Sequence, residues 1–121
     1  MNQNKQSFRF PKSMRLRRNA DFQFVYRRGK SIPSMNMVLL VAHRRGMSKV
    51  GFSCGKKVGN SVVRNRVKRY MKEAYRLMAK DVADGYRLVF IARKPMEHMD
   101  FHKTYRGMRA LMKKSGVFEK D

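Results

Sequence analysis

One long amphipathic segment, residues 60–81, constrains the fold of this 121-residue chain more than any other feature. Apolar side chains recur in it at spacings of four, three, four and three residues, as expected of a helix with one buried face: Val63, Val67, Tyr70, Ala74 and Leu77. Asn60 or Ser61 is placed to cap the first turn of this helix. An apolar stripe of this length has to be buried against other elements of the fold.

The segments before and after this helix have the pattern of strands. Residues 49–54 form the first candidate strand, and a glycine-bracketed loop, 55–60, leads from it into the helix. After the helix, a turn at 84–85 precedes a second strong candidate strand, residues 86–92. Two strands joined through one helix are candidates for parallel neighbours in a sheet, and such a crossover is right-handed by default.

The N-terminal third predicts one helix and one further strand. The helix covers residues 19–28 and is ended by Gly29. Residues 31–34 have the composition of a connector, and a near-continuous apolar run predicts a strand over 35–43. A short turn separates that strand from residues 49–54, so we expect the two strands to pair as a hairpin.

A last amphipathic helix is predicted over residues 101–114, ended by Gly116. The whole chain is therefore predicted to have an α+β fold. With two or three strands before the long helix, we expect a single sheet of about four strands packed with three helices, in the order α-β-β-β-α-β-α, with one βαβ crossover. Residues 1–121 form a single domain in this interpretation, in which 1–17 are a basic, flexible arm.

The chain lacks the sequence features of a secreted or membrane protein. Its longest apolar run, residues 37–42, is far shorter than the roughly 20 residues that span a bilayer. The lone Cys54 cannot form an internal disulfide, which fits a reducing compartment. The acid-free N-terminus resembles an organelle transit peptide, but Pro11 interrupts any long amphipathic helix there. We therefore predict a cytoplasmic protein with no membrane partner.

Positive charge is concentrated in the first part of the chain. Residues 1–72 contain nineteen Lys and Arg but only one carboxylate, Asp21, whereas the remaining 49 residues hold eleven bases and seven acids. Unpaired like charges at this density repel one another and destabilise the compact state. A polyanion relieves this repulsion and releases its own condensed counterions, which makes nucleic acid the expected partner.

The cations of the long helix gather on one side. At 100° per residue, the side opposite the apolar stripe is lined by Arg64, Asn65, Lys68, Arg69, Lys72 and Arg76, with Arg66 near the border of the stripe. A solvated helix stabilised by ion pairs would interleave acids, yet Glu73 is the only acid between Asp21 and Asp81. This side therefore predicts RNA or DNA contact.

Phe22 and Tyr26 lie one turn apart on the first predicted helix, with Arg18 nearby. Two interpretations remain open for these aromatic rings. They could stack on unpaired bases, or they could anchor the helix on the sheet, which periodicity alone favours.

Catalytic chemistry in the polypeptide itself is not predicted. Gly46 and Gly51 have the spacing of a phosphate-binding loop, but Phe52 stands where that motif requires a lysine. The three histidines are scattered and do not have the spacing of a zinc site. A metal-dependent nuclease needs several carboxylates around its ions, and the basic part of the chain offers only Asp21. We predict no catalytic residue, no metal site and no cofactor bound by the protein.

Residues 51–69 carry a resemblance to a known family. Their sequence, GFSCGKKVGNSVVRNRVKR, resembles the signature of the bacterial ribonuclease P protein subunit. Residues 17–22 are similar to the first helix of that family, and residues 91–95 to its last strand and exit. The resemblance extends over most of the chain.

The resemblance implies an RNA-binding subunit of an endoribonuclease. Such subunits bind a large catalytic RNA, one protein per RNA, whose magnesium ions hydrolyse the bond that releases the 5′ leader of precursor tRNA. The residues implied to dock the catalytic RNA are Lys56, Lys57, Asn60, Arg64, Asn65, Arg66, Lys68 and Arg69. No obligate protein partner is implied, and the family's βαβ crossover around this helix is left-handed.

The resemblance also implies a cleft between the first helix and the sheet that holds the single-stranded leader. Its residues would be Arg18, Phe22, Tyr26 and Leu40. Some family members offer an aromatic ring from the first strand, where this chain has Met37, Leu39 and Leu40. We therefore expect an apolar surface rather than a stacking ring from that strand.

Two other function classes stay open on the residues alone. A ribosomal or RNA-chaperone protein would have similar charge and size, but its affinity for tRNA would not depend on a 5′ extension. A self-sufficient nuclease would cleave without any RNA subunit, and the missing acid cluster argues against it.

Overall fold

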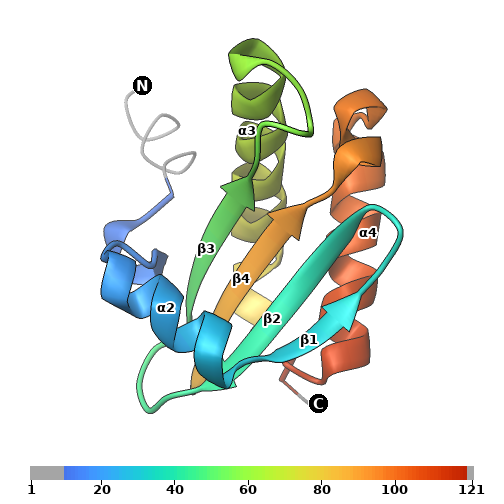
Figure 1. The fold of residues 1–121 in the computed structure, drawn as a ribbon. Coiled ribbons are helices and arrows are strands. Elements are labelled where there is room, and N and C mark those ends of the chain that lie inside the picture. Colours follow the sequence, from blue (N-terminus) through green and yellow to red (C-terminus); the bar gives the residue numbers. More distant parts are fainter. Residues whose placement is uncertain (1–9, 120–121) are drawn as a thin grey trace, which may run out of the picture.

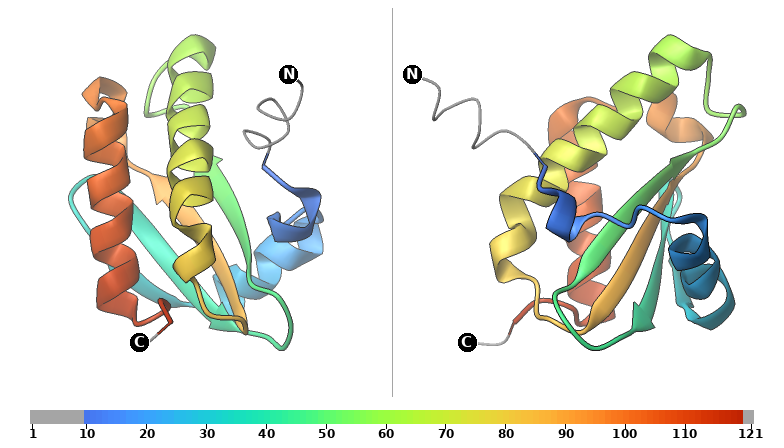
Figure 2. Two further views of the ribbon diagram at one scale, coloured as in Figure 1. Left: turned by 180° about the vertical axis from the view of Figure 1, so that it is seen from behind. Right: turned by 90° about the vertical axis from the view of Figure 1, so that its left-hand side faces the viewer.

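The computed structural model describes residues 10–119, which form one four-stranded sheet with helices on both faces (Figure 1). The elements in chain order are η1 (Lys12–Met14), α2 (Asn19–Arg28), β1 (Lys30–Pro33), β2 (Met37–His43), β3 (Lys49–Cys54), α3 (Ser61–Met78), η2 (Ala79–Asp81), β4 (Tyr86–Ala92), η3 (Lys94–His98) and α4 (Phe101–Ser115). Helices α3 and α4 cover one face of the sheet, and α2 crosses the other (Figure 2). The predicted α+β class and element order are confirmed.

The strand order is β1-β2-β4-β3, so the predicted hairpin between β2 and β3 is wrong. Strand β4 lies between them, antiparallel to β2 and parallel to β3. It takes the central place because Leu88, Val89 and Phe90 are all fully buried, which requires cover on both faces of the sheet. The loop between β2 and β3 passes the start of β4. There the Gly85 N–H donates a hydrogen bond to the Gly46 carbonyl at 2.8 Å, which holds the loop in place.

Two further predictions concern residues 31–34 and the pairing of β3 with β4, and only the second is confirmed. The segment predicted as a connector is in fact the edge strand β1, in which Ser31 is paired with Leu40 and Pro33 with Val38. Proline is tolerated there because an edge strand has one side without ladder hydrogen bonds. The parallel pairing of β3 and β4 around α3 is confirmed. The hand of this crossover stays a prediction, left-handed if the family resemblance extends to it.

Helix α3 begins as predicted but buries a different stripe in its second half. The Asn60 side-chain oxygen accepts the Val63 N–H at 3.0 Å, which identifies Asn60 as the cap. Beyond Val67, the buried side chains are Met71, Ala74, Tyr75 and Met78. The predicted Leu77 is 45% exposed, and Tyr70 is half-buried with its ring edge-on to Phe101.

The buried stripe is turned by roughly 60° from the predicted one, at 3.6 residues per turn. It turns because α3 packs against the sheet and against α4 at once, and the long side chains of Met71, Tyr75 and Met78 fill the space between these elements. This rotation brings the side of α3 that carries Arg64 and Lys68 towards the edge strand β3.

Residues 10–17 lie along the outer edge of β3. The Leu16 N–H donates to the Val50 carbonyl at 3.0 Å, and Leu16 itself is buried. The Phe10 ring lies 6.0 Å from that of Phe52 and 5.8 Å from that of Tyr75. Of the segment predicted as a basic arm, residues 1–9 lie outside the described residues.

Residues 10–119 form two apolar clusters, one on each face of the sheet. The larger cluster lies between the sheet and α3 and α4, and the smaller one, built around Leu16, Val25, Ala42 and Val89, lies under α2. Among residues 10–119, no helix combines the length and apolar character needed to cross a membrane.

Gly51 allows α2 to approach the sheet closely. A β-carbon at this position would overlap the ring of Phe22 from α2 and touch Leu16. We expect Gly51→Ala to lower the free energy of unfolding by about 1–3 kcal/mol, the usual cost of overpacking. Gly55→Ala is the matched control because nothing lies within 4 Å of its added β-carbon. Equal unfolding midpoints of the two variants in urea would show that the Phe22–Gly51 contact does not position α2.

Candidate nucleic-acid interface

Helix α2 covers only part of its face of the sheet (Figure 1). On this face the register aligns Leu40, Val89 and Gly51 across β2, β4 and β3, and α2 packs over this row. The next row along the strands consists of Val38, Ile91 and Ser53, all of which are half-buried rather than buried. A partly exposed strip of sheet, apolar at Val38 and Ile91, therefore lies beside α2.

Three of the predicted leader residues lie close together at α2, with different degrees of exposure: Phe22 and Leu40 pack on the cluster under α2, and Tyr26 lies beside Phe22. Phe22 is half-buried against Gly51, so it anchors α2 on the sheet. Tyr26 is 42% exposed, with its ring 6.4 Å from that of Phe22. Leu40 is half-buried on the α2 side, whereas Met37 and Leu39 are fully buried on the opposite face of the sheet.

Arg18, the residue that precedes α2, lies in a cluster of cations. It lines a pocket of about 510 Å³ together with Arg15, Arg17, Asp21 and Lys49. Four cations surround one carboxylate there, next to the N-terminus of a ten-residue helix. The electrostatics of this pocket favour an anion.

Besides Asn60, four of the predicted RNA-docking residues are exposed. Lys56 and Lys57 lie in the loop between β3 and α3, while Asn65 and Arg69 lie on α3. The Arg69 guanidinium stands 5.4 Å from the centre of the Tyr70 ring. These side chains have the exposure that contact with a phosphate backbone needs.

Three other docking candidates also stabilise the fold. Asn60 caps α3, as described above. Arg64 donates to the Gly59 carbonyl at 2.8 Å, and Arg66 donates to the Glu97 carbonyl at 2.7 Å. A guanidinium has five N–H donors, so each of these arginines keeps donors for a phosphate. Substitutions of Arg64 and Arg66 would therefore remove a hydrogen bond of the fold together with the predicted RNA contact.

Lys68 connects the basic side of α3 to the face covered by α2. It lines a pocket of about 180 Å³ at the edge of β3, together with Lys72, Phe22, Phe10 and Arg15. We call this the β3-edge pocket. Lys68 and Arg64 also lower the pKa of the nearby Cys54 thiol, although its burial outweighs them and raises that pKa overall.

Sequence reasoning missed two contributors to the β3-edge pocket. Phe10 and Arg15 were assigned to an arm, yet both lie against β3. The available signal was an aromatic residue followed by cations just ahead of the first helix, but this pattern does not reveal that the segment pairs with a strand edge.

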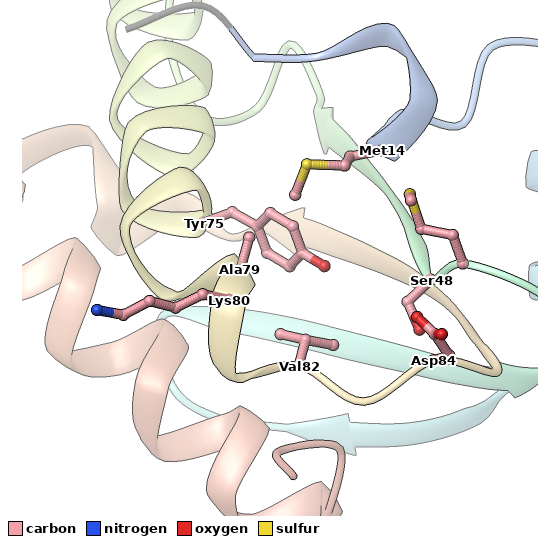
Figure 3. Close-up of a pocket in the computed structure, with 8 residues that line it drawn as sticks. Met14, Ser48, Tyr75, Ala79, Lys80, Val82 and Asp84 are labelled. Atoms are coloured by element: carbon pink, nitrogen blue, oxygen red, sulfur yellow. The ribbon is translucent and has the colours of Figure 1, made fainter. Parts of the chain in front are cut away.

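A further pocket, of about 230 Å³, is built for packing rather than chemistry (Figure 3). The hydroxyl of Tyr75 points towards Ser48 and Asp84, whereas the amine of Lys80 points away. Burial raises the pKa of Tyr75 to about 12, so its phenol stays neutral near pH 7. The Ser48 hydroxyl donates to the Ala83 carbonyl at 2.6 Å and accepts the Tyr86 N–H at 3.0 Å, which leaves it no activating base.

The acids near the C-terminal helix have structural roles. Glu97 pairs with Lys94 at 2.7 Å, and this bond lowers the pKa of Glu97. Asp100 accepts the Lys103 N–H at 2.8 Å as the cap of α4, which lowers the pKa of Asp100. Within residues 10–119, no group of three or more His, Cys, Asp or Glu is arranged to hold a metal ion.

Comparison with known proteins places this arrangement in one family. The family model for ribonuclease P matches residues 10–116. The ribonuclease P protein component of Clostridium botulinum (strain Alaska E43) is 43% identical over 112 residues, 86% of this chain and 90% of the relative. That of Natranaerobius thermophilus is 43% identical over 107 residues, 88% and 93% of the two chains.

Solved structures agree with these sequence relatives. The ribonuclease P protein of Staphylococcus aureus superposes with a TM-score of 0.81 at 28% identity, covering 89% of this chain and all of that one. The protein from Thermotoga maritima, solved with 1-(4-fluorophenyl)-2-thiourea, gives a TM-score of 0.76 at 28% identity, covering 83% and 98%. With one family model spanning nearly all described residues and relatives above 40% identity, this chain belongs to the ribonuclease P protein family.

Proposed function

We propose that this protein is the RNA-binding subunit of ribonuclease P, which removes the 5′ leader from precursor tRNA. Family membership supports this activity, and the β3-edge pocket is the observation that carries the assignment of surfaces. In that pocket Phe22, from the α2 side, meets Lys68 and Lys72, from the basic side of α3. A protein with this geometry can hold two RNA segments next to each other, one on each side.

The basic side of α3 and its preceding loop are the proposed contact with the catalytic RNA, one protein per RNA. The exposed Lys56, Lys57, Asn65 and Arg69 would bind phosphates directly. Arg64, Arg66 and Asn60 hold the loop and the helix in place while their remaining donors face the RNA. Arginine is suited to this role because its planar fork can bind a phosphate bidentately.

The face beside α2 is the proposed site of the single-stranded leader. The half-buried Val38 and Ile91 give bases an apolar surface, and the exposed Tyr26 ring gives them a stacking partner. Arg18 and its neighbours provide an anion site at the N-terminal end of α2. This combination favours an unpaired strand over a duplex, because only unpaired bases expose their faces for stacking.

We assign the chemical step of the reaction to the RNA subunit and the binding of the precursor to the protein. Magnesium ions bound by the RNA would supply the hydrolytic chemistry, and no side chain of this chain is assigned a catalytic role. The protein binds, orients and retains the precursor, so that the scissile bond stays at the RNA's reactive centre. We place this activity in the cytoplasm, in keeping with a lone cysteine and a reducing environment.

A cleavage assay tests the proposed function directly. Precursor tRNA is incubated with the polypeptide alone, with a bacterial ribonuclease P RNA alone, and with both, in magnesium buffer of near-physiological salt. We expect release of the 5′ leader to be fastest with both components and absent with the polypeptide alone. Cleavage by the polypeptide alone would identify a self-sufficient nuclease, and no stimulation of the RNA would exclude the subunit role.

A further inference from the structure

A groove of about 590 Å³ lies between the edge strand β1 and the C-terminal end of α4. We call it the β1–α4 groove. It is separate from the β3-edge pocket, because β1 and β3 are the two opposite edges of the sheet (Figure 1). Neither the RNA-docking residues nor the partly exposed strip beside α2 contribute to its walls.

The β1–α4 groove combines an apolar floor, two aromatic rings and a rim of cations. Ile32 and Val41 form the floor. The rings of His43 and Tyr86 lie 5.1 Å apart, centre to centre, and Tyr86 is only half-buried. Arg28, Lys30 and Lys114, all exposed, line the groove from α2, β1 and α4 respectively.

Charge identifies the class of occupant. None of the seven carboxylates in residues 10–119 lines this groove, so its three cations are not neutralised by the walls around them. A second copy of a chain with a formal charge of +22 would be repelled. Ring faces next to cations match a nucleotide, whose base stacks while its phosphates pair with lysine and arginine.

The position of Arg28 indicates which RNA reaches the groove. Arg28 is the last residue of α2, the helix whose Phe22 and Tyr26 lie at the proposed leader site. The floor residues Ile32 and Val41 belong to the cluster on the α3 and α4 face, so a strand that follows α2 beyond Tyr26 reaches the groove by passing Arg28 and rounding the edge strand β1. We propose that the β1–α4 groove binds the distal, upstream nucleotides of the 5′ leader, through stacking on Tyr86 and His43 and phosphate contacts with Arg28, Lys30 and Lys114. This inference rests on the proposed function, because it assumes that the proximal leader lies along α2.

A leader-length series in the reconstituted holoenzyme tests the inference. Precursors with leaders of about 5 and about 15 nucleotides are compared, since single-strand sites on proteins span about 4–16 nucleotides. The wild-type protein should bind the longer precursor more tightly. Lys30→Ala combined with Lys114→Ala should lose about tenfold in affinity for the long precursor and leave the short one unchanged. The slope of log affinity against log salt should fall by about 1.4 for the long precursor, as two lost single-strand contacts require.

Lys103→Ala combined with Lys113→Ala is the matched control. Both lysines are exposed on α4, and neither lines the groove, so this pair removes the same charge elsewhere. The inference is overturned if the control pair loses as much affinity as the groove pair, if short and long precursors weaken equally, or if the groove pair weakens binding of the catalytic RNA alone. The proposed function would fail separately, through a wild-type holoenzyme that does not distinguish precursor from mature tRNA.

Discussion

Replacing Lys56, Lys57 and Arg69 together by alanine should weaken binding to ribonuclease P RNA by about 100-fold at constant salt. All three side chains are exposed. Each lost contact between an exposed cation and a phosphate costs up to about 1 kcal/mol, and three such losses give this factor. Titration of labelled RNA with wild-type and variant protein measures the change. The salt dependence of the affinity should also become shallower, by about 2 to 3 in the slope of log affinity against log salt.

The control for this prediction is a variant with the same net charge. Lys80→Ala, Lys103→Ala and Lys113→Ala remove three exposed lysines from η2 and α4, away from the proposed docking surface. We expect this variant to lose at most a few-fold in affinity through the weaker long-range field. Equal losses in the two triple variants would mean that the RNA responds only to total charge, and the docking assignment would then be wrong.

Phe22→Ala should cost about 2 to 4 kcal/mol of folding free energy, the second large effect that we expect. The ring is packed between α2 and the sheet, where it fills the space that Gly51 leaves open. Urea unfolding followed by circular dichroism gives the loss. The truncation should also enlarge the β3-edge pocket and reduce the preference for precursor over mature tRNA, because Phe22 lines it.

Tyr26→Ala separates leader binding from folding. Since Tyr26 is 42% exposed, its truncation should change the stability by less than about 1 kcal/mol. Loss of one stacked base should nevertheless lower the affinity for precursor tRNA by about tenfold and leave mature tRNA unaffected. A Tyr26→Ala protein that binds both tRNAs as the wild type does would remove Tyr26 from the leader site.

Elements with a strong local signal were predictable from the sequence. The Asn60 cap of α3 and the strand Tyr86–Ala92 depend on neighbouring residues alone, and the structure confirms both. The same holds for the end of α4, where Gly116 takes the left-handed conformation with a φ of 78°. Local chemistry determines such features, so a single sequence is enough to locate them.

Features that depend on long-range pairing were not predictable in this way. Residues 37–43 and 49–54 are separated by a short loop, which is the usual sign of a hairpin, yet β4 inserts between them from later in the chain. The edge strand β1 was missed for the same reason, because it pairs with β2 over a short stretch and its own composition is that of a connector. Competition among strands for the buried centre of a sheet is a property of the whole chain.

In the candidate site, too, features set by local sequence were predictable and features set by long-range packing were not. The cations of α3 could be identified from the sequence itself. The leader site at α2 was predicted from the family resemblance. The exposure of each side chain was not evident, because it depends on the rotation of α3 about its axis. That rotation is set by Met71, Tyr75 and Met78, which pack against elements distant in sequence. As a result of this rotation, Lys68 lines the β3-edge pocket.

The most direct test of the central claim is the dissociation constant for precursor and for mature tRNA, measured with and without ribonuclease P RNA at one fixed salt concentration. The protein and the RNA together should bind precursor tRNA more tightly than mature tRNA, and neither component alone should show this preference. Equal binding of precursor and mature tRNA by the complete holoenzyme would contradict the claim. It would leave a basic RNA-binding protein that does not recognise the 5′ leader.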